Sequence, residues 1–117
     1  MKLIKDEITI DELKAMAKNR YGDLVKAVVD VKKEIMAVDA ELHSDQEKLL
    51  IENGSKQENL WGINFYPDLK GEDFIEFDSM INLRPSQGNR SRGVEDEKIR
   101  EEIKKIVNKL IKNGLPT

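Results

Sequence analysis

Three of the chain's five arginines lie within nine residues, and this is its strongest chemical signal. Arg84, Arg90 and Arg92 belong to a segment, 84–92, that contains no acidic residue. A guanidinium group presents a planar fork of N–H donors that matches carboxylate and phosphate oxygens, and a Gly-, Ser- and Asn-rich loop can aim backbone N–H groups at the same anion. The amides of Asn82 and Asn89 could orient a ligand there. We therefore predict an oxyanion site made by Asn82, Arg84, Asn89, Arg90 and Arg92; the alternative is that the arginines pair with nearby acids.

His43, the only histidine, is the second candidate for chemistry. An imidazole titrates near physiological pH, so His43 could act as a general acid or base, oriented by Asp39 or Asp45. The alternative is a structural or surface histidine. A metal site formed by His43, Asp45 and Glu47 is disfavoured, because residues two apart on a helix point in different directions. We predict a catalytic role for His43 and no metal site, and the sequence identifies no cofactor.

Residues 24–42 fit two templates. Their apolar residues repeat with the four–three spacing of a helix, from Leu24 to Leu42. The first half of the segment is also rich in valine and alternates with Lys26 and Asp30, and Lys32–Lys33 lie midway like a polar turn. We favour a hairpin of two strands, although tight hairpin turns usually contain Gly or Asn.

Three helices are expected elsewhere. A capping box, in which Ser or Thr precedes Glu by three residues, marks the start of the first two, and an apolar stripe marks the third. The predicted helices cover residues 10–20, after Thr9 with Glu12; 45–53, after Ser44 with Glu47; and the C-terminal segment that carries Ile99, Ile103, Ile106, Val107 and Leu110.

Two more strands follow from alternating apolar residues. The segment 60–66 places Trp61, Ile63 and Phe65 on one face, and the segment 75–84 alternates until Pro85. If these strands form a hairpin, Asn82 and Arg84 approach residues 57–59 at one end of the sheet. The segment 85–93 has no large apolar side chain, so we expect a surface loop.

The expected order is helix, hairpin, helix, hairpin, helix. A small antiparallel sheet of four strands with helices covering one face would bury the apolar stripes, so we predict an α+β fold. The chain has room for one domain, which we place at residues 1–113, with a short tail at 114–117.

Composition excludes several functions. With no cysteine, the chain cannot form disulfides, cysteine-ligated zinc or iron–sulfur sites, or a thiol nucleophile. A net charge of −3 makes bulk nucleic-acid binding unlikely, and no apolar run suggests a signal peptide or a membrane span. We expect a cytoplasmic protein. Its abundance of lysine and glutamate is typical of heat-adapted organisms and suggests a thermophilic prokaryote.

Three stretches also look familiar: AELHSD (40–45), GSKQENLWGINFYP (54–67) and SMINLRPSQGNRSR (79–92). They resemble a family of small prokaryotic proteins described as a domain of unknown function, over close to half of the chain. The resemblance implies an uncharacterised protein of bacteria and archaea. It supplies no activity, cofactor or catalytic residue.

Two kinds of function follow from these residues. The first is binding of a small phosphate- or carboxylate-bearing ligand by the arginine loop, with His43 available to move a proton. The alternative is a non-enzymatic interaction protein that grips an acidic macromolecule with the same loop, or that forms a homodimer through the C-terminal helix. No phosphate loop, nucleophile elbow or metal motif is present, so the sequence leaves open whether the protein is an enzyme.

Overall fold

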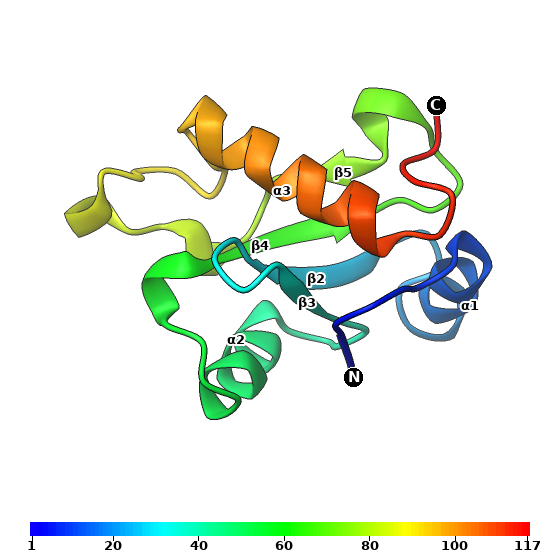
Figure 1. The fold of residues 1–117 in the computed structure, drawn as a ribbon, viewed down its shortest axis with the longest axis horizontal. Coiled ribbons are helices and arrows are strands. Elements are labelled where there is room, and N and C mark those ends of the chain that lie inside the picture. Colours follow the sequence, from blue (N-terminus) through cyan, green and yellow to red (C-terminus); the bar gives the residue numbers. More distant parts are fainter.

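Five antiparallel strands form one sheet in the computed structural model, which describes residues 1–117 (Figure 1). The strands lie in the order β1-β3-β2-β4-β5. This confirms the α+β class but corrects the strand number, because Lys2–Ile4 is too short to show a clear alternation. The strands are β1 (Lys2–Ile4), β2 (Val25–Asp30), β3 (Ile35–Val38), β4 (Leu60–Phe65) and β5 (Ile75–Glu76), and the helices are α1 (Ile10–Arg20), α2 (His43–Glu52) and α3 (Glu97–Leu110).

Helices cover both faces of the sheet, so the prediction of one covered face is wrong. Figure 1 shows α3 on one side of the sheet and α2 on the other. The larger core contains twenty buried residues, including Val29 of β2 and residues of α1 and α3. A second cluster lies on the opposite face, where Val28 packs with Leu50 of α2. The valine-rich β2 is apolar on both faces, and burial of both requires a helix on each side.

The hairpin favoured for residues 24–42 is confirmed as β2 and β3. Its turn contains neither Gly nor Asn, because the carboxylate of Asp30 stabilises the turn by accepting hydrogen bonds from its backbone. Asp30 Oδ1 accepts the backbone N–H groups of Lys32 and Lys33, both at 2.9 Å. Glu34 completes the four-residue connection with a φ of 58°.

One of the two predicted capping boxes is formed. At α1 the Thr9 hydroxyl accepts the N–H of Glu12 at 3.0 Å, and the Glu12 carboxylate accepts the N–H of Thr9 at 3.4 Å. The box predicted at Ser44 and Glu47 is wrong, since α2 begins two residues early, after Leu42, and has no side-chain cap. Burial of His43, Gln46 and Leu50 against the sheet accounts for this start.

The strand predicted for residues 75–84 is wrong beyond Glu76. Residues Met80–Asn82 form a short 3₁₀ helix, because the Ser79 hydroxyl accepts the N–H of Ile81 at 3.2 Å and starts a turn. Alternation of apolar and polar residues is not sufficient for a strand when a side chain offers the backbone a local partner.

The two ends of the chain are joined by backbone hydrogen bonds. Ile8 donates to the carbonyl of Leu110 at 2.8 Å and accepts from Lys112 at 2.9 Å, which forms a parallel bridge between Ile8 and Ile111. The segment expected as a tail also folds back, because Pro116 accepts the N–H of Gly71 at 2.9 Å. None of the helices has the length and apolar character that crossing a bilayer would require.

Candidate functional site

The predicted binding residues begin with Asn82, which lies on the open edge of β4. Its Nδ2 donates to the carbonyl of Gly62 at 2.9 Å, and its Oδ1 accepts the N–H of Gly62 at 2.8 Å. The same Nδ2 donates to the carbonyl of Arg92 at 3.0 Å. The side chain is 0% exposed. All of its donors and acceptors contact the backbone, so Asn82 anchors the loop to the sheet.

Arg84 continues the same edge. Its guanidinium donates to the carbonyls of Leu60, of Ile81 (2.9 Å) and of Gln57 (3.0 Å), and it lies 4.5 Å above the Trp61 ring. The contact with Gln57 agrees with the expected approach of Arg84 to residues 57–59. Burial lowers the pKa of Arg84, which the Glu47 carboxylate opposes. Arg84 therefore connects the loop to the backbone of Gln57 and of Leu60 in β4.

Asn89 is the hub of the loop. Its Nδ2 donates to the carbonyls of Asn82 (2.7 Å), Ser91 (3.1 Å) and Gly93 (2.8 Å), and its Oδ1 accepts the N–H of Glu95 at 2.9 Å. Residues 89–95 thus curl around one buried amide. Backbone bonds between Arg84 and Asn89 close the loop at its base.

Arg90 and Arg92 are the two predicted residues that this frame presents to solvent. The Arg90 side chain is exposed and has no hydrogen bond or ion pair. The backbone N–H of Arg90 donates to Glu95 Oε2 at 2.8 Å. Arg92 makes a two-pronged ion pair with Asp78, with Nε–Oδ1 at 2.8 Å and Nη2–Oδ2 at 3.3 Å. The side chains of this pair are 55% and 42% exposed. The loop already holds two carboxylates.

His43 lies under the sheet at the first turn of α2. Its Nε2 is 2.8 Å from the carbonyl of Ile63, and since a carbonyl can only accept, Nε2 carries the proton. Burial lowers the pKa of His43; the Ile63 carbonyl opposes this shift, the positive charge of Lys26 adds to it, and Asp78 opposes it again. Neither Asp39 nor Asp45 orients the ring, because its hydrogen bond is to the carbonyl of Ile63. Asp39 instead pairs with Arg20 at 3.1 Å.

A comparison with models of protein families shows which family this chain belongs to. A family model described as "Protein of unknown function (DUF5674)" matches residues 2–110. The chain belongs to this family. The resemblance seen in the sequence is thereby confirmed as to the family. No curated protein and no solved structure is significantly similar to the chain.

A polar cluster that was not among the predicted site residues lies beside the loop. Asn64 is buried and donates to Glu76 Oε1 at 2.8 Å and to the carbonyl of Asp78 at 3.3 Å. Tyr66 donates to the same Glu76 oxygen at 3.2 Å, and burial together with that carboxylate raises the pKa of Tyr66. The only sequence signal was an asparagine inside a strand. No group of three His, Asp or Glu side chains is placed to hold a metal ion.

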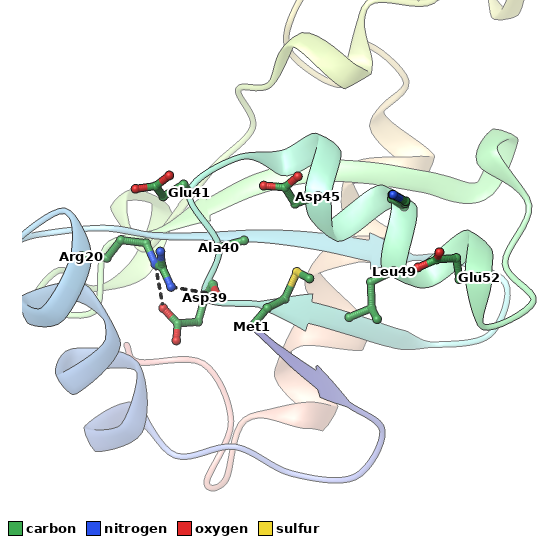
Figure 2. Close-up of a pocket in the computed structure, with 9 residues that line it drawn as sticks. Met1, Arg20, Asp39, Ala40, Glu41, Asp45, Leu49 and Glu52 are labelled. Carbon is green, nitrogen blue, oxygen red and sulfur yellow. Dashed lines mark hydrogen bonds and ion pairs between the residues drawn. The ribbon is translucent and has the colours of Figure 1, made fainter.

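A cleft of this protein lies away from the predicted site residues. Figure 2 shows it beside α2, with the paired Arg20 and Asp39 at one end. It has a volume of about 430 Å³ and contains none of the predicted site residues. Acids outnumber bases there, so the cleft suits an oxyanion poorly. Its charged lining residues are Arg20, Asp39, Glu41, Asp45, Lys48 and Glu52.

Proposed function

We propose that this protein binds an oxyanion, a phosphate or a carboxylate, on the exposed guanidinium groups of Arg90 and Arg92. The proposal concerns binding and includes no reaction. Asn82, Arg84 and Asn89 contribute to it as the frame of the loop. Their hydrogen bonds to backbone atoms hold residues 89–95 in one conformation, which lowers the entropy lost when a ligand is fixed there.

The observation that carries the proposal is the free guanidinium of Arg90. It is the arginine of this loop whose side chain is exposed and has no hydrogen bond or ion pair, although 23 acidic residues are available in the chain. A second observation supports it, because N–H groups of Arg90 and Arg92 already donate to the carboxylates of Glu95 and Asp78. Its donors are therefore oriented for anionic oxygens.

Titration with inorganic phosphate tests the proposal. Two-dimensional NMR of ¹⁵N-labelled protein at pH 7.5 and constant ionic strength follows the backbone amide signals of residues 89–95, which every variant retains, together with the Arg90 and Arg92 Nε–H signals of the wild type. We expect saturable shifts at millimolar phosphate, confined to residues 89–95. The double variant R90A/R92A should lose them, and K18A, which removes an exposed cation from α1, should retain them. Shifts that do not saturate, or that persist in R90A/R92A, would contradict the proposal.

A second titration separates a small ligand from an acidic macromolecule. A short single-stranded oligonucleotide carries many phosphates, and its affinity should fall steeply with salt if several are bound at once. For one phosphate on two arginines we expect a shallow dependence on salt.

The apolar stripe of α3 gives no support to self-association, because Ile103, Ile106, Val107 and Leu110 are buried within one chain.

We also infer the setting of this activity. A cysteine-free composition rich in lysine and glutamate supports the cytoplasm of a heat-adapted prokaryote.

A further inference from the structure

Asp78 occupies the guanidinium of Arg92 in the same way that a ligand carboxylate would. The two-pronged geometry, 2.8 and 3.3 Å, is the one by which arginine holds a free carboxylate. Both partners are anchored by their backbones. The carbonyl of Asp78 accepts from Asn64 at 3.3 Å, and that of Arg92 accepts from Asn82 at 3.0 Å and from the N–H of Ser79 at 2.9 Å.

Glu95 is the second carboxylate held by the loop, but it binds the backbone of Arg90 and not the guanidinium. Its Oε2 accepts the N–H of Arg90 at 2.8 Å, and its own N–H is held by Asn89 Oδ1 at 2.9 Å. Asp78 therefore occupies one guanidinium of the exposed pair, whereas Glu95 is a tethered negative charge next to Arg90 that does not pair with its guanidinium. Asp78 competes with an incoming ligand at the high effective concentration of an intramolecular contact.

We propose that Asp78, as an internal competitor for the guanidinium of Arg92, and Glu95, as a fixed negative charge next to Arg90, make this loop selective for a phosphate monoester over a carboxylate. The inference rests on the proposed function. A free carboxylate that displaces Asp78 exchanges one monoanion for another and gains nothing, whereas a phosphate monoester brings close to two charges and three acceptor oxygens. The pair at Arg92 is solvent-accessible and surface ion pairs are weak, so a stronger anion can open it.

The test compares methyl phosphate with acetate at pH 7.5 and equal ionic strength, by the same NMR signals. The variants are D78N and E95Q, each of which removes one of these negative charges. The control is D68N, which changes the net charge equally at an exposed aspartate near Lys14. Thermal unfolding of each variant verifies that it is folded, and E95Q carries the test if D78N is not.

We expect the wild type to bind methyl phosphate at least ten-fold more tightly than acetate. In D78N the affinity for acetate should rise by about two- to five-fold, the range expected for release of a surface ion pair. In E95Q it should rise as well, because a fixed negative charge next to Arg90 is removed. The ratio of the affinities for methyl phosphate and acetate should therefore decrease in these two variants, and it should be unchanged in D68N. Equal binding of the two ligands by the wild type, or equal gains in D78N, E95Q and D68N, would overturn the inference and leave the proposed function standing. Absence of binding by every variant would overturn both.

Discussion

The side-chain amide of Asn82 pairs with the backbone of Gly62 as a neighbouring strand would, with one donor bond of 2.9 Å and one acceptor bond of 2.8 Å. β5 pairs only with Asn64 and Phe65, so the rest of this edge of β4 has no strand beside it. Asn82 and Arg84 satisfy it with side-chain donors and acceptors. The loop residues that most resembled a binding site therefore complete the sheet.

Replacing Asn82 with alanine should be strongly destabilising. The variant leaves the N–H and carbonyl of Gly62 buried without partners, and each such group costs about 1–3 kcal/mol. We expect the free energy of unfolding to fall by about 3 kcal/mol in urea denaturation. The control N19A removes an exposed asparagine from α1 and should change stability by less than about 0.5 kcal/mol. A similar small effect in N82A would show that the edge does not depend on this amide.

Gly62 should accept no side chain while Ser79 is present. A Cβ at position 62 would lie 2.5 Å from Ser79 Cβ and 2.6 Å from its Oγ, so G62A should cost about 1–3 kcal/mol through overpacking. The double variant G62A/S79G removes both contacts and should be less destabilised than the two single variants predict together. G93A is the matched control, since its nearest contact is 3.5 Å. Additive losses in the double variant would argue against this clash.

Arg84 and Arg90 should separate stability from binding. R84K cannot reproduce the planar fork that reaches Leu60, Ile81 and Gln57, and we expect a loss of about 2–3 kcal/mol together with a change in Trp61 fluorescence. R90A should change stability by less than about 0.5 kcal/mol yet weaken phosphate binding. The reverse pattern, a stable R84K and an unstable R90A, would contradict the assignment of roles.

His43 should make stability depend on pH below neutrality. Burial lowers the pKa of the folded imidazole below 6.5, its ordinary value, so the unfolded chain takes up a proton first as the pH falls. The stability that the buried, neutral His43 contributes is complete above about pH 6.5, and it is lost as the pH decreases toward the pKa of His43 in the folded state. Urea unfolding at pH 7.5, 6.5 and 5.5 should show this loss, and H43Q should flatten the profile. An NMR titration that gives the native imidazole a pKa of 6.5 or more would exclude this account.

The composition leads to an expectation for thermal stability. If the abundance of lysine and glutamate reflects heat adaptation, the midpoint of thermal unfolding should lie well above the range of about 45–65 °C that is usual for mesophilic domains. Differential scanning calorimetry measures it directly. A midpoint within the mesophilic range would remove the support for a thermophilic source.

Local patterns predicted most of the fold. The Thr9–Glu12 box and the alternation around Trp61 depend on near neighbours, and the structure has both α1 and β4 where they were expected. The double-sided covering of the sheet depends on where Val28 meets Leu50, a contact between residues 22 positions apart. Periodicity along one segment carries no information about such a partner.

The candidate site was less predictable for a related reason. Residue type suggested that Arg84 and Asn89 bind a ligand, but their partners are backbone carbonyls whose positions depend on the whole sheet. Asp78 and Glu95 carry no distinctive motif, and they matter because the loop folds onto them. Arg90 carried the same sequence signal as Arg84, and its exposed guanidinium distinguishes it only in the structure.

The bridge between Ile8 and Ile111 has a consequence for biosynthesis. During synthesis, the backbone of Ile8 has no partner until residues 110–112 have been made. Both hairpins of the sheet can form earlier, because their strands are close in sequence. The last event in folding should therefore be the pairing of Ile8 with Ile111, which fixes the segment before α1 to the segment after α3.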